Sequence, residues 1–478
     1  MLTIKEINSS RNYIFLNFFT ILVPIILYPF ITKILTPEEF GNFIFIQAFA
    51  MLLVTICDFG CVVGFKRNYF ECKSKNEKNQ LLISIQIFAL SIYSVIISIN
   101  FLFEDLIFTI LNRVEGTNNF WVLILLAASV DYITKYYLTY LVNEEKSKTY
   151  CYLLFIKNIL YLVFVIFFLF NNYKIQSLVL SLLYSNLTLF CIIIIIQLRS
   201  IKFIFSFVDI KNVVLISYPL IFRTLFGQLN TKLDKILITI ISSVSNTGIY
   251  SIAQSISYFI FQFTTSLDKV FITKLNKKLF SGNHNIKNYL SPYLFIVSLA
   301  TISIILFNDI IYKLIIDKKY YGAGNIVIIL SLHYFFLFFQ KITGTQLVYL
   351  KKIWLAGNLF LLSVITNFFL NMLLINNFGV IGAALATLIT SITFMIIQNI
   401  FVRKFMKLKM QMKDIFFICI VVVTFAFIQS LINIIFDQTA SGVFLIVKIL
   451  IFSLFIFYTY VFDIFSFRKF IKNFIKIK

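Results

Sequence analysis

The stretch Gln176–Gln197, with the sequence QSLVLSLLYSNLTLFCIIIIIQ, contains no charged side chain. A helix rises about 1.5 Å per residue, so about 20 apolar residues cross the ~30 Å hydrocarbon core of a bilayer. The stretch lacks the alternation of apolar and polar residues that a membrane-spanning β-strand shows. Since a lipid-exposed backbone must satisfy its own hydrogen bonds, this stretch predicts a transmembrane helix.

Thirteen further stretches resemble it in length and composition. The fourteen predicted spans are 13–35, 42–64, 81–103, 120–142, 150–170, 176–197, 213–241, 248–272, 290–312, 325–350, 353–375, 378–402, 414–435 and 442–463. The hydrophobic fraction is 60% and the mean hydropathy is +0.93, both above the range of soluble globular proteins. The chain is therefore predicted to be an all-α integral membrane protein with about 14 transmembrane helices. The connections are too short to hold a soluble domain.

The basic residues indicate the orientation of these spans. Of the 42 Lys and Arg residues, 28 lie in every second connection and 5 lie in the connections between. Because cytoplasmic loops carry the excess of Lys and Arg, this alternation predicts a multi-pass protein with both termini in the cytoplasm. The net charge of +22 is concentrated at helix ends, where anionic lipid headgroups attract it. We therefore expect membrane lipids as partners, and no nucleic acid.

An internal repeat with an offset of 207 residues divides the chain. The segment Phe40–Gln47 aligns with Thr247–Gln254, matching Gly at the second position and Gln at the eighth. Six spans in each half would give a parallel repeat, with the substrate route between two bundles. The predicted domains are 1–212, a six-helix bundle; 213–402, a second six-helix bundle; and 403–478, two additional helices with a basic tail. Chance similarity between two apolar segments is the alternative.

Small residues stand where several spans begin. Gly41 and Gly248 open the second helix of each half, and Asn377–Ala384 opens the twelfth span with two glycines and two alanines. Small residues allow helix backbones to approach closely. We therefore expect a close helix contact at the start of the twelfth span, and turns of the chain at Gly41 and Gly248.

Three ordered blocks at these junctions resemble those of bacterial O-antigen and capsule repeat-unit flippases. They are Leu35–Gly41 with Asp58–Gly60, Lys66 and Arg67; Leu233–Ile238 with Thr247–Ala253; and Asn371–Ala384. Each block is loosely defined, and their order along the chain carries the resemblance. The chain is thus similar to the polysaccharide transporter family of the multidrug/oligosaccharidyl-lipid/polysaccharide exporter superfamily.

This resemblance implies two six-helix bundles around a central cavity that opens alternately to each side. It implies a flippase in the bacterial inner (cytoplasmic) membrane that moves an undecaprenyl-diphosphate-linked oligosaccharide to the periplasmic leaflet, for lipopolysaccharide O-antigen or capsule. The implied partners are this lipid-linked oligosaccharide, a polysaccharide polymerase, a chain-length regulator and a coupling ion, proton or sodium. No enzymatic activity, cofactor or metal is expected.

Charged residues inside the seventh span suggest a substrate site. Arg223, Asn230 and Asp234 fall on one helical face, and Lys235 lies nearby. Ionisable residues within a membrane usually face a cavity or a partner. Arg223 could bind the diphosphate of the lipid carrier through two hydrogen bonds, while Lys235 would act as a point charge. In the alternative interpretation, Asp234 and Lys235 lie near the outer interface and extend toward water.

Four further charges in spans are candidates for the cavity. Asp131 and Lys135 stand at positions i and i+4, where an ion pair within one helix is the simplest interpretation. The same Asp131 could instead couple transport to proton or sodium movement. Lys157 and Lys341 add two possible cavity cations. Asp58 is assigned a packing or gating role rather than ion binding, and His333 is interpreted as a packed residue rather than a proton relay.

A cation-coupled multidrug or small-molecule exporter on the same scaffold is the alternative function. Such exporters usually have twelve spans and cavity carboxylates for cationic drugs. Here nine basic residues stand in the spans against seven aspartates, and this excess of positive charge favours an anionic substrate. A membrane glycosyltransferase or polymerase is disfavoured, because no large loop with catalytic carboxylates is present.

Overall fold

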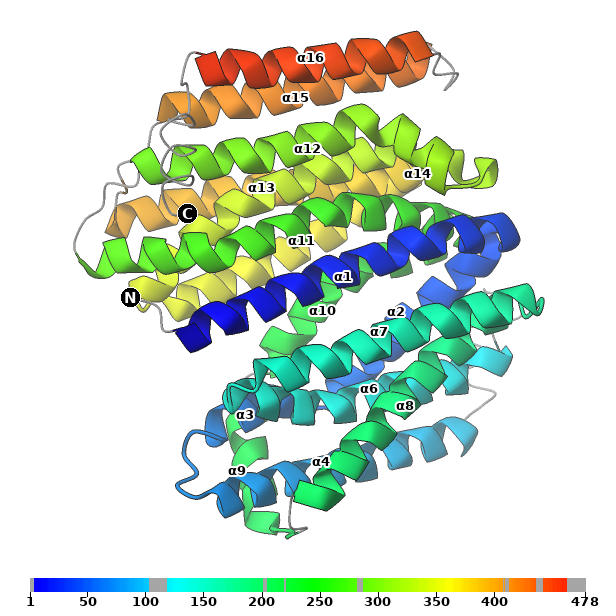
Figure 1. Ribbon diagram of the computed structural model, residues 1–478, viewed down its shortest axis with the longest axis vertical. Helices are drawn as coiled ribbons and strands as arrows, with labels where there is room; N and C mark the ends of the chain where they lie inside the picture. Colours follow the sequence, from blue (N-terminus) through cyan, green and yellow to red (C-terminus); the bar gives the residue numbers. More distant parts are fainter. Residues whose placement is uncertain are drawn as a thin grey trace. The chain divides into compact units, whose positions relative to one another are not determined.

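The computed structural model describes residues 4–102, 118–200, 204–218, 221–281, 287–406, 408, 412–435 and 442–461. These residues form α-helices joined by short turns, with one 3-10 helix, η2 (Figure 1). The helices are α1 (Ile4–Ile34), α2 (Pro37–Cys57), α3 (Cys61–Asn68), α4 (Lys75–Leu102), α6 (Asn118–Asn143), α7 (Ser147–Phe170), α8 (Ile175–Ser200), α9 (Phe207–Ser217), α10 (Ile221–Ile241), α11 (Val244–Phe280), α12 (Lys287–Ile315), η2 (Lys318–Ala323), α13 (Gly324–Tyr349), α14 (Ile353–Phe405), α15 (Met412–Ile435) and α16 (Gly442–Val461).

Each of the fourteen predicted spans overlaps a described helix. Two of them are too long, because 42–64 runs from α2 through a turn into α3, and 213–241 includes the end of α9 as well as α10. Within the described residues, nine helices are long and apolar enough to cross a membrane. Helices α10 and α11 are long enough to cross a membrane but are not among these nine helices. Helix α10 carries four charged residues, and α11 carries several Ser and Gln residues. The chain is a multi-pass membrane protein, and these two helices are its most polar candidates for spans.

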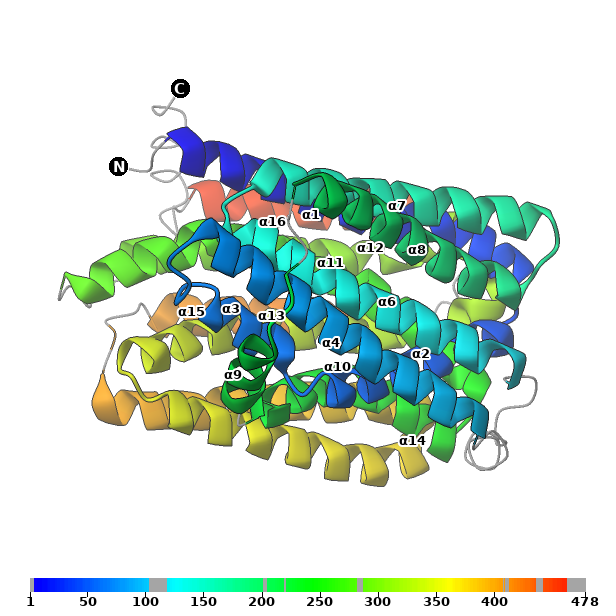
Figure 2. The same cartoon turned by 90° about the horizontal axis from the view of Figure 1, so that it is seen from below.

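Packing divides the chain into two compact units, Met1–Gly248 and Ile249–Lys478. In the first unit, α1 packs along α7, α7 along α8, and α8 against α6 (Figure 1). Helix α6 also contacts α2 and α4, and α10 lies beside α2 (Figure 2). The predicted bundle boundaries at 212/213 and 402/403 were deduced from an internal repeat. The division into compact units does not test a repeat, so these boundaries stay predictions.

Helix α2 begins at a well-formed N-terminal cap. The Thr36 side chain accepts a hydrogen bond from the backbone N–H of Glu39, and the Glu39 carboxylate accepts one from the N–H of Thr36. This reciprocal capping box, followed by Pro37 in the first turn, satisfies backbone donors that a helix start leaves open. The sequence TPEE thus ends α1 and starts α2 within three residues.

Contacts within the first unit bring together connections predicted to lie on the same side of the membrane. Gln80 donates a 2.9 Å hydrogen bond to Asp209, and Lys78 lies 3.6 Å from Glu144, which joins three connections predicted to be cytoplasmic. Lys174 lies 4.0 Å from Glu39, which joins two connections predicted to be periplasmic. The alternation deduced from charge therefore agrees with the packing of this unit.

In the second unit, α13 packs against α12 and α14, and α15 packs against α12 and α13. Its buried core is rich in aromatic rings from α11, α12 and α13, including Phe271, Phe295, Phe335 and Phe338. The predicted spans 353–375 and 378–402 both lie in α14. Gly379 divides α14 at φ 55°, ψ −133°, a conformation that side chains other than glycine rarely adopt.

The two arms of α14 approach each other closely beyond this break. A methyl group at Gly382 would lie 2.0 Å from the carbonyl oxygen of Leu374. The close contact expected from the small residues of Asn377–Ala384 is therefore confirmed. A larger side chain at Gly382 would force the two arms apart.

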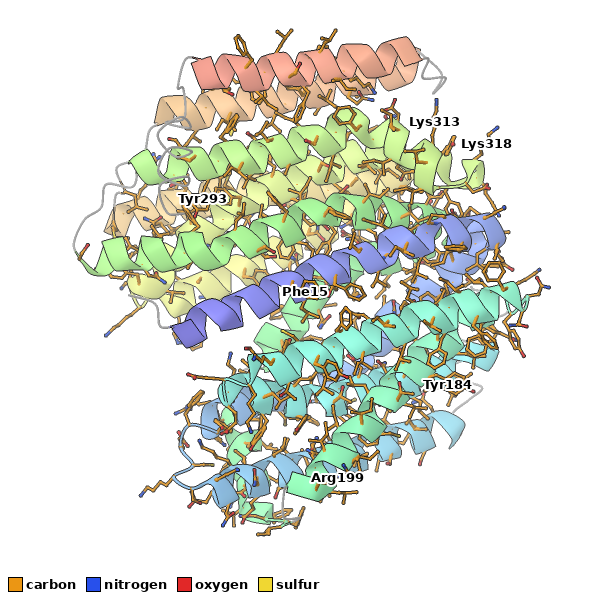
Figure 3. All side chains as sticks on the ribbon, in the orientation of Figure 1. Phe15, Tyr184, Arg199, Tyr293, Lys313 and Lys318 are labelled. Carbon is orange, nitrogen blue, oxygen red and sulfur yellow. The ribbon has the colours of Figure 1, made fainter. Side chains whose placement is uncertain are left out.

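Exposed side chains of the described helices are apolar along the helices and basic at several ends. Phe15 on α1 and Tyr184 on α8 project outward, whereas Arg199 lies at the end of α8 and Lys313 and Lys318 lie near the end of α12 (Figure 3). Aromatic and aliphatic surfaces on a spanning helix meet lipid chains, and terminal Lys and Arg reach the headgroups.

Candidate functional site

Three charged side chains meet where α6 packs on α7 in the first unit. Asp131 Oδ1 lies 2.5 Å from Lys157 Nζ of α7, and Asp131 Oδ2 lies 3.0 Å from Lys135 Nζ, one turn further along α6. The predicted pair of Asp131 and Lys135 is present, and Lys157 joins it from a neighbouring helix. One carboxylate holding two ammonium groups leaves a net positive charge.

The ammonium group of Lys135 has further neighbours. It lies 3.7 Å from the centre of the Tyr132 ring, a cation–π arrangement that stabilises a desolvated cation. The hydroxyl of Tyr132 is hydrogen-bonded to that of Thr55 on α2. The site is therefore held by three helices, α2, α6 and α7.

Helix α10 adds cations to the same unit. Lys232 lies within electrostatic range of Lys135, and Lys235 lies within range of Lys232 and Asp234. Like charges in a low-dielectric region repel each other, and an anionic ligand between them relieves that repulsion. We call these four lysines the lysine cluster: Lys135 and Lys157, which share Asp131, and Lys232 and Lys235 on α10.

The face of α10 predicted from the sequence contains residues in different surroundings. Asn230 is exposed, and a methyl group at Gly227 would meet open space. Asp234 is buried. Arg223 lies on α10, but its side chain is outside the described part of the structure. The cavity roles of these residues stay predictions.

Asp58 follows the C-terminal end of α2, and its carboxylate accepts hydrogen bonds from two tyrosines. Tyr136 Oη donates at 2.5 Å and Tyr93 Oη at 3.3 Å, both to Oδ1, and the backbone N–H of Val62 donates to Oδ2 at 3.3 Å. The carboxylate joins the end of α2 to α4 and α6. These contacts are those of a packed residue, and the gating role predicted as the alternative stays a prediction.

A second polar group lies outside the spans, at the junction of α6 and α7. Glu144 accepts a hydrogen bond from the Tyr69 hydroxyl, and the ammonium groups of Lys78 and Lys146 lie 3.6 and 3.9 Å away. The Tyr69 hydrogen bond and these cations hold the pKa of Glu144 below its usual range. This group fastens α3, α4 and α6 together.

In the second unit, two lysines of the described spans form ion pairs with aspartates on neighbouring helices. Lys341 Nζ lies 2.5 Å from Asp268 Oδ2, linking α13 to α11, and Lys448 Nζ lies 2.7 Å from Asp309 Oδ1, linking α16 to α12. His333 is hydrogen-bonded to Ser391, as expected for a packed residue. Neither ion pair was deduced from the sequence, because the partners lie 73 and 139 residues apart.

No group of three or more His, Cys, Asp or Glu side chains that could hold a metal ion occurs among the described residues. The charged groups of the spans are therefore described as binding or packing elements. Their chemistry is that of ammonium groups, carboxylates and tyrosine hydroxyls.

The fold is that of transporters of the superfamily to which flippases and multidrug exporters belong. The structure resembles the lipid II flippase MurJ in an inward closed conformation, with a TM-score of 0.71 and 18% identity, over 96% of this chain and 100% of that one. It also resembles an inward-facing multidrug resistance MATE family transporter of the MOP superfamily, with a TM-score of 0.61 and 12% identity, over 81% and 95% of the two chains.

The sequence identifies the family within that fold. The family model described as polysaccharide biosynthesis protein matches residues 11–272, more than half of the chain, and the chain belongs to this family. A curated relative is a probable low-salt glycan biosynthesis flippase of Haloferax volcanii, 28% identical over 124 residues. That alignment spans about a quarter of each protein, 26% of this chain and 26% of the relative.

Proposed function

We propose that this protein is a flippase for an oligosaccharide linked to undecaprenyl diphosphate, moving it from the cytoplasmic to the periplasmic leaflet by alternating access. The family, the transporter fold and the named flippases among its relatives support a membrane transporter of lipid-linked glycans. In this proposal the protein acts in the bacterial inner membrane, with both termini cytoplasmic, in O-antigen or capsule production. A polymerase and a chain-length regulator would use the product.

The observation that carries the proposal is the surplus of positive charge in the spans of the first unit. Its described side chains include four lysines in the lysine cluster against Asp58, Asp131 and Asp234. A diphosphate would bind between these ammonium groups through charge-assisted hydrogen bonds. Arg223, on the same helix as Lys232 and Lys235, would add a planar donor for two phosphate oxygens.

The geometry gives less support to a cation-coupled drug exporter. A cationic drug or a coupling ion requires an accessible carboxylate with spare negative charge. Asp131 already lies against two ammonium groups, and Asp58 accepts hydrogen bonds from two tyrosines. We therefore assign Asp131 to holding Lys135 and Lys157 in place, and no ion-coupling role to it.

The test is a deletion strain analysed for both the surface polysaccharide and its lipid-linked repeat unit. We expect the surface polysaccharide to disappear while the lipid-linked unit is still made and collects in the cytoplasmic leaflet. Absence of the lipid-linked unit itself would indicate a transferase and overturn the proposal. Accumulation of cationic dyes in the deletion strain, with normal polysaccharide, would indicate a drug exporter instead.

A further inference from the structure

Helix α11 of the second unit has a row of partly exposed polar side chains. Gln254, Tyr258, Gln262 and Thr265 recur at intervals of three or four residues, so they share one helical face. Tyr258 is exposed, and the other three are half-buried. Amide and hydroxyl groups facing hydrocarbon would lose their hydrogen bonds to water. This face of α11 therefore suits an aqueous or ligand-filled space, and we call it the α11 polar face.

An aromatic platform lies on this face. The rings of Tyr258 and Phe261 stack with centroids 5.1 Å apart, and Tyr334 of α13 meets them edge-on or tilted, at 5.7 and 6.0 Å. Tyr334 is buried and supports the platform from behind. The Tyr258 ring remains 40% exposed, and its hydroxyl has no hydrogen-bond partner among the described residues. An exposed ring held rigidly in this way can accept a flat apolar surface.

An ion pair between α11 and α13 lies beside the aromatic platform. Lys341 Nζ lies 4.6 Å from the centre of the Phe261 ring and 2.5 Å from Asp268 Oδ2. Asp268 is 7% exposed, and its other carboxylate oxygen, Oδ1, is buried without a hydrogen-bond partner among the described residues. Asp268 therefore anchors the Lys341 ammonium group beside the platform.

We propose that the face formed by Tyr258, Phe261, Asp268 and Lys341 is a sugar-binding subsite. A sugar ring presents a face of C–H groups that packs on an aromatic ring, and its hydroxyls accept hydrogen bonds from ammonium groups. Tyr258 would bind the C–H face and Lys341 would donate to a hydroxyl, while Asp268 holds Lys341 in place.

The subsite lies within the second unit and is separate from the lysine cluster of the first. Ten residues of helix separate Tyr258 from Asp268, about 15 Å along the axis, so an extended glycan rather than a single sugar fits the face. The inference rests on the proposed function for the identity of its ligand. It adds that the glycan, and not only its lipid diphosphate, contributes to binding.

Purified full-length protein in nanodiscs can test this with two probes. One is undecaprenyl diphosphate without sugar; the other is the lipid-linked repeat unit extracted from the deletion strain. We expect wild type to bind the glycan-bearing probe more tightly. Tyr258→Ala and Tyr258→Leu should each weaken that binding by about tenfold, the scale of one aromatic contact, and leave the bare carrier unchanged. Tyr258→Trp should retain binding, and Asp268→Asn should weaken it.

Phe263→Ala is the matched control, because Phe263 lies on the same helix and is 39% exposed, close to Tyr258. Equal binding of both probes by wild type would overturn the subsite and leave the flippase proposal standing. Equal weakening of both probes by the Tyr258 variants would also overturn it, because it would indicate lost packing. If wild type binds neither probe, the proposed function fails, and the subsite fails with it.

Discussion

Gly41 and Gly248 contact each other at the crossing of α2 and α11, and the contact is reciprocal. A methyl group at Gly41 would lie 2.0 Å from the carbonyl oxygen of Val244, and one at Gly248 would lie 2.1 Å from that of Pro37. Each glycine therefore meets the carbonyl four residues before the other. The two glycines are separated by 207 residues, the offset of the predicted repeat.

The first prediction concerns this crossing. Gly41→Ala should lower the stability of the protein by about 1–3 kcal/mol, because backbone atoms must move to admit the methyl group. The melting temperature of the detergent-solubilised protein, followed by size-exclusion chromatography, measures the effect. Gly357→Ala on α14 is the control, since a methyl group there meets open space and should be neutral or stabilising. Equal melting of both variants would show that the crossing is not tight.

The second prediction concerns orientation. Reporter fusions after Lys78 and Lys211 should report cytoplasm, and fusions near Asn118 and Ser243 should report periplasm, because Lys and Arg are concentrated in the first set of connections. Alkaline phosphatase and green fluorescent protein give opposite signals on the two sides. The reverse pattern would place both termini in the periplasm and contradict the predicted topology.

The third prediction concerns Arg223. We expect Arg223→Ala to abolish export at normal protein abundance, since losing one charge-assisted contact would weaken diphosphate binding by about 2–3 kcal/mol, tens-fold or more. Arg223→Lys should restore export in part, because it keeps the charge and loses the planar two-point contact. Surface polysaccharide and protein level are measured together.

The competing explanation for Arg223 is neutralisation of Asp234. In that case the double variant Arg223→Ala with Asp234→Ala should recover export, because no unpaired buried charge would remain. Recovery in the double variant would make Arg223 a structural residue. Continued loss of export would support contact with the substrate.

The fourth prediction concerns Asp131. Asp131→Asn should destabilise the protein by about 3–5 kcal/mol, because Lys135 and Lys157 would lose their shared carboxylate and repel each other. Adding Lys157→Gln should restore much of the stability by removing one of the two cations. Thermal melting of the single and double variants tests this. If stability is unchanged in Asp131→Asn while export loses its dependence on a proton or sodium gradient, Asp131 is a coupling residue instead.

Local features of the sequence were sufficient to locate most spans, one ion pair and the tight junction at Asn377–Ala384. A span is recognised by the length and apolarity of a continuous segment, and Asp131 with Lys135 is recognised by a spacing of four residues. The close approach at Gly382 involves Leu374, only eight residues away. These properties depend on neighbours along the chain, whereas the contact between Gly41 and Gly248 could not be predicted in this way.

Only the tertiary structure decided which charges meet across helices. Lys157 reaches Asp131 because α7 packs on α6, and Lys341 reaches Asp268 across 73 residues because of the register between α13 and α11. The position of Tyr258 on a supported aromatic platform has the same origin. Hydropathy indicates that a residue lies in a span, but it does not indicate where the side chain points. That direction depends on how each helix is rotated against its neighbours, and the rotation is set by side-chain packing over the whole unit.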